Sequence, residues 1–437
     1  MPTRFIFFLT CSISLLYSGS YTLAALCEKG IQNNPKIKSL AHRSSASHSM
    51  YDQSISKYKP QLNISGQYGN QNYDLGSSEN MQRYHGVAYN YQFSLKQPIY
   101  RAQLLHSIKD AEAKEKMSKL VEIDEKAKLV TRILQVSIEL TRQRKIIDIL
   151  TKKVSLLGKA NENIQKKYHM QLASGADTFQ SQAMFQESKS DLIKAKQSYD
   201  YNLYNLRLLT KYEDVEKYIS ALHFDIPAVT RAFKKAKLRE IKNSIDNNTQ
   251  IKLDRQLINI AKVQIGMRNS ERSPQFDAVL SYGDAGGSLD AVTRQNDSRA
   301  MVTLNFPLYQ GGYVDDRVEE AKYLLMATQS DAENSRMNIR ISMEKALQNI
   351  KGGLESVKAQ KSAVEASRKY FEGAMESYKS GVASLTDAYL AESDYRENQL
   401  RLANSESDIY ISLAEVYYFS GIADCKHVER LQKKYFK

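Results

Sequence analysis

The chain has 437 residues, 62 lysines and arginines against 49 acidic residues, seven prolines, no tryptophan and 28 tyrosines. A net charge of +13 is typical of proteins that bind nucleic acid or anionic lipid. The lysines are spread along the helical stretches and are not gathered in one patch, and the N-terminus predicts export from the cytoplasm. We therefore exclude nucleic acid as a partner. Beyond the first residues no run of 18 apolar residues occurs, which excludes a transmembrane helix.

Residues 1–24 have the pattern of a signal peptide. Arg4 gives a basic start, a short apolar segment follows, and Thr22 and Ala24 fit the small-residue positions before a cleavage site. This pattern predicts export and a mature chain that starts near Ala25, and an uncleaved N-terminal anchor is the alternative. Cys27 raises the question of lipidation, but the residue before it is a leucine where lipidation requires a small residue.

The same order of features occurs twice along the chain. In each half, a helical stretch ends in Pro-Gln at residues 60–61 or 274–275 and is followed by two strand patterns, a proline corner, a very long helix, a Ser-Gly pair and a return helix. This order predicts a first structural repeat over residues 25–223 and a second over residues 224–423, followed by a basic C-terminal tail over residues 424–437.

Alternation of apolar and polar residues predicts four strands, at about residues 60–72, 84–96, 274–284 and 298–306. Each strand has one apolar and one polar face, as in a soluble sandwich or in a membrane barrel with a water-filled lumen. A sheet of four strands cannot close on itself, and an open edge is not tolerated in hydrocarbon. The membrane alternative therefore requires several copies of the chain to build one barrel.

Two stretches, residues 101–172 and 314–379, lack proline and carry apolar residues at helical spacing. A helix of about 70 residues is about 105 Å long at about 1.5 Å per residue, too long for a globular domain. Such helices predict coiled-coil pairing. The expected fold class is mainly α with membrane β.

Glycines, prolines and a serine mark the corners between these elements. Gly175 and Gly381 follow the two long helices and suit a helix C-terminus, and Ser384 suits the cap of the helix that follows. The strand–helix corners carry residues suited to sharp changes of backbone direction: Pro98, Pro307, Gly311 and Gly312.

The motifs of enzymes and of metal or nucleotide sites are missing from the sequence. The seven histidines show no metal-binding spacing, and neither the phosphate-binding glycine loop nor the nucleophile elbow occurs. We therefore expect no enzyme activity, no cofactor and no metal site.

Two cysteines remain after removal of the signal peptide, which takes Cys11 with it. Cys27 and Cys425 lie near opposite ends of the mature chain. In an oxidising periplasm they can form a disulfide if the fold brings the ends together, and free thiols are the alternative.

The duplicated order of helix, strand pair, "P-L-x-x-G-G" corner, long helix and "G-x-x-S-x-x-D-x-x-x-A" turn resembles the outer membrane efflux protein family of TolC-like channels. The resemblance covers about residues 27–421. It is closest in the second repeat, at FPLYQGG (306–312) and GVASLTDAYLA (381–391), and degenerate at QPIYRAQ (97–103) and GADTFQSQAMF (175–185).

The resemblance implies a homotrimer in the outer membrane of a Gram-negative cell. Each chain would give four strands to a twelve-stranded β-barrel in outer-membrane lipid and its long helices to an α-barrel across the periplasm. The helix ends would dock on a periplasmic adaptor and an inner-membrane ABC or RND-type pump, in type I protein secretion or multidrug efflux. The alternative is a soluble periplasmic coiled-coil adaptor or structural protein, but adaptors usually have one hairpin, and the duplicated strand pairs argue against it.

The resemblance also implies a closed periplasmic entrance at the helix turns. Tyr378 falls on a tyrosine position that helps to lock the closed state, and Asp387 on an acidic ring that constricts the entrance. The alternative is that Asp387 caps a helix and Tyr378 packs between helices. Ala383 stands where the family has an arginine and Ser181 where an acidic partner is expected, so the lock cannot be complete; Asp177 is a candidate substitute.

Overall fold

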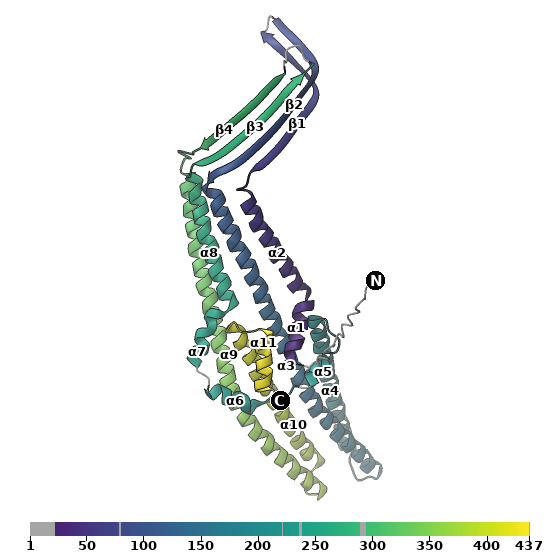
Figure 1. Cartoon of the computed structure of the whole chain (residues 1–437). Coiled ribbons are helices and arrows are strands. Elements are labelled where there is room, and N and C mark those ends of the chain that lie inside the picture. The colour runs from purple at the N-terminus through teal and green to yellow at the C-terminus, as the bar shows by residue number, and fades with distance from the viewer. Residues whose placement is uncertain (1–21, 78–79, 221, 236–237, 289–293, 437) are drawn as a thin grey trace, which may run out of the picture.

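The structure is a computed structural model, and it describes residues 22–77, 80–220, 222–235, 238–288 and 294–436. It is an elongated body with a sheet at one end and helices running from the sheet to the other end (Figure 1). Both termini of the described chain lie near the middle of its length (Figure 1).

The sheet contains four antiparallel strands in the order β1-β2-β3-β4, namely β1 (Gln61–Ser77), β2 (Asn80–Arg101), β3 (Gln275–Gly287) and β4 (Gln295–Asn305). The two repeats join where β2 pairs with β3, for example at Phe93 opposite Tyr282. Within the described chain, β1 and β4 are the edges of this sheet. Ile64 and Val302, on these edge strands, are 68% and 65% exposed, so apolar side chains of the sheet are uncovered in the single chain.

Four helices belong to the first repeat: α1 (Leu23–Asn33), α2 (Pro35–Ser56), α3 (Ala102–His169) and α4 (Gly175–Thr210). Three matching helices belong to the second: α8 (Thr249–Asn269), α9 (Tyr313–Lys379) and α10 (Leu385–Phe419). The long helices α3 and α9 have 68 and 67 residues, and α9 passes through Gly352 and Gly353 without a break. None of the described helices combines the length and the apolar character that crossing a membrane requires.

A large core lies at mid-length, where short elements surround the long helices: α5 (Glu216–Ser220), α6 (Ile226–Lys235), α7 (Leu238–Asn243), the 3-10 helix η1 (Ser244–Asn247) and α11 (Cys425–Tyr435). The other 3-10 helix, η2 (Ser270–Arg272), lies between α8 and β3, next to the sheet. Tyr410 of α10 is buried in this core, and its hydroxyl donates to the carbonyl of Tyr435 and accepts from the amide of Asp225 at 2.7 Å. A polar group that is buried without a hydrogen-bond partner destabilises the fold, and these two bonds satisfy the buried Tyr410 hydroxyl.

Residues 425–435, expected as part of a basic tail, form the helix α11. Val428, Leu431 and Tyr435 recur at helical spacing and are buried, while the lysines point outwards. This apolar stripe packs against the core, so the C-terminal segment is part of the folded body.

The start of α1 bears on where the signal peptide ends. The Thr22 hydroxyl accepts from the amide of Ala25 at 3.3 Å, and the amide of Leu23 donates to Oε1 of Gln432 at 2.7 Å. Leu23 is fully buried. We therefore propose that the mature chain starts at or before Thr22, instead of at Ala25. Sequencing the N-terminus of the purified protein should read this start, and a first residue at Ala25 would contradict it.

Candidate functional site at the helix turns

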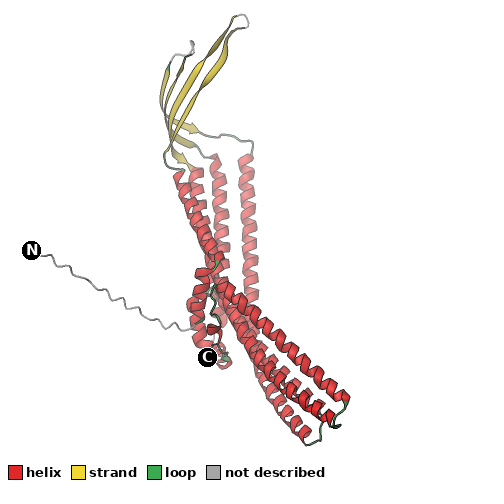
Figure 2. Ribbon diagram, turned by 90° about the vertical axis from the view of Figure 1, so that its right-hand side faces the viewer, coloured by secondary structure: helices red, strands yellow, loops and turns green. Residues whose placement is uncertain are grey.

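The two long hairpins reverse at the end of the molecule opposite the sheet. The first tip (residues 170–174) joins α3 to α4, and the second tip (residues 380–384) joins α9 to α10. Figure 2 shows both turns at this end, with the four helices running up from them.

The two tips have the same backbone design, but not around the glycines expected from the sequence. At the second tip Gly381 is left-handed, with φ +79°, and the amide of Val382 bonds to the carbonyl of Ser377 at 2.9 Å. At the first tip the left-handed residue is Gln171, with φ 58°, and the amide of Leu172 bonds to the carbonyl of Lys167 at 2.7 Å. Both are helix C-caps that satisfy otherwise unpaired carbonyls.

The role expected of Gly175 is therefore wrong, because this glycine begins α4 and does not end α3. The residue equivalent to Gly381 is Gln171, four positions earlier. The acidic residue is expected six positions after the left-handed residue of the tip. Counted from Gly175 this position is Ser181, but counted from Gln171 it is Asp177. An aspartate therefore occupies the equivalent position in both tips.

Each of these aspartates caps its own helix. Asp387 Oδ2 accepts from the amide and the hydroxyl of Ser384 at 3.2 and 2.6 Å, and the Ser384 hydroxyl accepts from the amide of Asp387 at 3.1 Å. Ser174 and Asp177 form the same reciprocal box at the first tip. Such boxes satisfy amides at the helix start. Asp387 therefore takes part in capping α10, as the alternative interpretation of this residue predicts. Only its Oδ2 makes these bonds, and the Asp387 side chain remains exposed to solvent.

Tyr378 forms a contact between the two hairpins. Its hydroxyl accepts a hydrogen bond from Nζ of Lys167, on α3, at 3.0 Å, and the ammonium lies 5.0 Å from the ring centroid. Sequence reasoning missed Lys167, because no motif marks a single lysine near the end of a long helix. Ala383 provides no side-chain donor here.

Two further contacts join the hairpins next to this bond. The Thr386 hydroxyl donates to Oε1 of Gln180 at 3.2 Å. Ser181 and Tyr389 are both buried, and their hydroxyls lie within reach of each other without forming a well-aligned hydrogen bond. We call the three contacts, Lys167–Tyr378, Gln180–Thr386 and Ser181–Tyr389, the tip contacts.

A buried acid lies one turn further along α10. Glu392 has no exposed surface, and Nε of Arg396 donates to its Oε1 at 2.7 Å, while its Oε2 has no hydrogen-bond partner among the described residues. Burial raises the pKa of the Glu392 carboxyl above its ordinary value. Nothing in the sequence distinguishes this buried glutamate from the many other charged residues of the long helices.

The strand–helix corners connect the sheet to the long helices. The pairing of β2 with β3 shifts register between Pro98 and Tyr100. Arg101, at the end of β2, binds the buried carboxylate of Asp277 with two donors, one at 2.7 Å from Oδ1. In the second repeat Gly311 and Gly312 both have positive φ, +60° and +84°, and Pro307 lies in the coil after β4. Here the corner glycines supply a backbone conformation that other residues rarely adopt.

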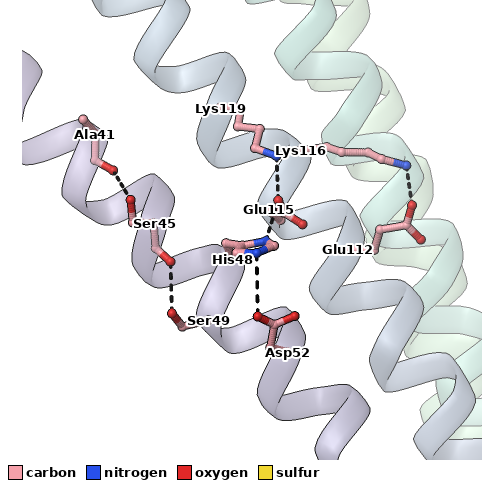
Figure 3. Close-up of polar contacts among 9 residues, drawn as sticks. All are labelled: Ala41, Ser45, His48, Ser49, Asp52, Glu112, Glu115, Lys116 and Lys119. Carbon is pink, nitrogen blue, oxygen red and sulfur yellow. Dashed lines mark hydrogen bonds and ion pairs between the residues drawn. The ribbon is translucent and has the colours of Figure 1, made fainter. Parts of the chain in front are cut away.

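A polar contact between α2 and α3 is shown in Figure 3. His48 Nδ1 lies 3.1 Å from Oε1 of Glu115, its Nε2 lies 3.6 Å from Oδ2 of Asp52, and Lys119 donates to Glu115 at 2.6 Å. Lys119 first, and then His48, hold the pKa of the Glu115 carboxyl below its ordinary value. The lysine already occupies the shared oxygen, and within the described ranges no group of three or more His, Cys, Asp or Glu side chains could hold a metal ion.

Comparison with known proteins gives matches in sequence and in fold. Residues 241–421 match the model of the family described as outer membrane efflux protein. The chain is 20% identical over 416 residues to the outer membrane protein TolC of Vibrio cholerae, covering 94% of this chain and 93% of that protein.

Among solved structures, the outer membrane protein VceC of Vibrio cholerae aligns with a TM-score of 0.77 at 14% identity, over 91% of this chain and 96% of that one. The CmeC outer membrane channel of Campylobacter jejuni also aligns with a TM-score of 0.77 at 14% identity, over 94% and 89% of the two chains. These TM-scores show that the chain shares the overall fold of both proteins. The resemblance noted in the sequence is confirmed: residues 241–421 match the outer membrane efflux protein family, and the chain as a whole has the fold of these two outer-membrane proteins.

Proposed function

We propose that three copies of this chain form one outer-membrane channel that exports proteins or small molecules. The observation that carries the proposal is the open sheet. Its edge strands β1 and β4 have unpaired backbone groups on their outer sides, and its exposed apolar side chains include Ile64 and Val302. In hydrocarbon both need cover, which neighbouring copies and lipid can provide.

We further propose that the tips dock on a periplasmic adaptor and an inner-membrane ABC or RND-type pump. The turns carry apolar side chains that are open to solvent in the single chain: Val382 is 84% exposed and Leu172 is 71% exposed. Exposed apolar side chains that gather at one end of a molecule favour contact with another protein. The sequence also lacks a nucleotide-binding motif, so the energy for transport comes from such a partner.

The cargo is proposed as a class only, since type I protein secretion and multidrug efflux both fit this architecture. Among the residues that the structure describes, neither the strands nor the tips carry a group that favours one solute. The proposed substrate is therefore whatever the pump delivers to the entrance, and the chain acts as a duct.

The proposal is tested by location and conductance. The protein should require detergent for extraction from outer membranes and should form discrete single-channel steps in a planar bilayer. Cross-linking should give a trimer as the largest species. Recovery from the soluble periplasm without detergent would instead support the adaptor or structural alternative.

Asp387 should contribute to ion selectivity if three copies surround the entrance. In the variant Asp387→Asn the amide oxygen can still cap α10, while three negative charges are lost. We expect the preference for cations over anions to fall severalfold, and block by divalent cations to weaken, because crowded like charges in a narrow pore attract counter-ions. Reversal potentials measured in a salt gradient check this.

The variant Asp177→Asn is the matched control, because Asp177 makes the same capping box at the other tip. It reports the effect of losing a charged cap on channel stability. If both variants change selectivity equally, or neither does, Asp387 is not the constriction residue.

A further inference from the structure

The first and the last helix of the described chain pack against each other. Helix α1 contacts α11 in the mid-length core, as Figure 1 shows, and the bond from Leu23 to Gln432 ties the start of α1 to α11. Cys27 lies in α1 and has no exposed surface, and Cys425 is the first residue of α11 and is half-buried against the same core. The only two cysteines of the described chain therefore come from opposite ends of the sequence to one place.

The side chains of Cys27 and Cys425 are close enough to interact. The Cys27 thiol lies within hydrogen-bonding reach of the Cys425 thiol, and both are free thiols in the structure. The hydrogen bond from Cys27 lowers the pKa of Cys425, and the same contact together with burial raises the pKa of Cys27. Cys425 also stands at a helix N-terminus, which favours the thiolate. The more reactive thiol is thus the one that solvent can reach.

The surroundings of Cys27 argue against lipidation at this residue. A lipidated cysteine must be the first residue of the mature chain, which would remove Leu23 and Leu26, both fully buried. Acyl chains on the sulfur would also need space that the packed core between α1 and α11 does not offer. A small modification that stays inside the core fits this site.

We propose that Cys27 and Cys425 form an intramolecular disulfide in the exported protein. The Cys425 thiolate attacks a disulfide of a periplasmic oxidant, forming a mixed disulfide and releasing one oxidant thiolate. The Cys27 thiol then attacks the Cys425 sulfur, the second oxidant sulfur leaves as a thiolate, and the Cys27 proton passes to it. The chain loses two electrons and two protons, and the oxidant becomes a dithiol. Periplasmic conditions allow such a bond to persist.

The disulfide would fasten the N-terminal helix to the C-terminal helix and close nearly the whole mature chain into one loop. It lies at mid-length, away from the tips and from the sheet, so it serves the integrity of the subunit and is independent of the entrance.

The test uses the full-length protein, extracted from membranes in detergent and denatured with iodoacetamide without reductant. We expect no alkylated cysteine in the intact mass of the mature chain and two after reduction. A tryptic map without reductant should contain one cross-linked peptide pair that joins Cys27 to Cys425. Two alkylated cysteines before reduction, a lipid mass on Cys27, or a cross-link between chains would each overturn the proposal.

The variant Cys425→Ser keeps the fully buried Cys27 in place. It should carry one alkylated thiol without reduction and should migrate on a non-reducing gel like the reduced wild type, whereas the oxidised wild type migrates faster. Equal mobility of oxidised and reduced wild type would contradict an intramolecular loop of this size. Single-channel conductance should be unchanged in the variant. The disulfide proposal and the channel proposal can therefore be contradicted independently of each other.

Discussion

Replacing Gly421 by alanine should remove most of the folded protein from the outer membrane. Gly421 follows the C-cap of α10 and has φ +71°, and a Cβ built on it would lie 2.3 Å from the carbonyl oxygen of Asn247 and 2.9 Å from the amide nitrogen of Asn248. These are backbone atoms of the segment that leads into α8, so no side-chain rotation relieves the contact. The same segment is already fixed to α10, because the Asn248 amide group donates to the carbonyls of Tyr418 and Phe419.

The expected cost combines two effects. A left-handed backbone costs a residue with a Cβ about 1–2 kcal/mol, and forcing atoms into a packed site costs typically about 1–3 kcal/mol and sometimes more. Total stabilities of domains are about 5–15 kcal/mol. A loss of this size should be visible as a clearly lower melting temperature by circular dichroism and as less protein in the membrane fraction.

Two other glycines separate these effects. Gly381 is also left-handed, with φ +79°, but no described atom lies within 4 Å of its built Cβ, so Gly381→Ala should show the backbone cost alone. Gly373 lies inside α9 with similar free space, and Gly373→Ala should stabilise by up to about 1 kcal/mol through helix propensity. If Gly421→Ala melts no lower than Gly381→Ala, the contact with Asn247 is not the cause.

The sequence predicted the elements whose pattern is long and regular. The four strands could be recognised because alternation over ten or more residues leaves few other structures, and the structure extends β2 to Arg101 beyond the expected end near residue 96. The helices α3 and α9 could be recognised because helical spacing persists over nearly 70 residues without proline. The short helices α5, α6 and α7 were missed, since five to ten residues give too little periodicity to identify a helix.

The first tip shows why a sequence motif can be placed at the wrong residue. Glycine is the usual left-handed residue at a helix end, so the sequence predicts Gly175 as the counterpart of Gly381. The structure places Gln171 in that conformation at a cost of about 1–2 kcal/mol. Nothing in the identity of a glutamine signals this. Contacts between hairpins, such as Lys167 with Tyr378, are equally hidden, because they depend on how two helices far apart in sequence are aligned.

Removing the Lys167–Tyr378 bond should shift the proposed channel towards its open state. The bond is largely exposed, and exposed contacts of this kind are worth about 0.2–1 kcal/mol each. In a trimer the bond would occur three times, so its loss would favour opening by roughly 0.6–3 kcal/mol, or about threefold to about 150-fold in the ratio of open to closed channels. Single-channel recordings of Lys167→Met and of Tyr378→Phe should show this increase in open probability.

The pair of variants decides whether the contact itself is responsible. Because both substitutions remove the same bond, the double variant should open no more often than either single variant, whereas additive effects would mean that the two residues act separately. Lys166→Met is the matched control, since Lys166 pairs with Glu162 on its own helix at 2.8 Å and does not reach the other hairpin. Opening in the control as well would assign the effect to lost surface charge and would remove Lys167 from the gate. A gate held by several weak contacts per subunit can be released by small forces at the tips, which is the kind of control that a docking partner can exert.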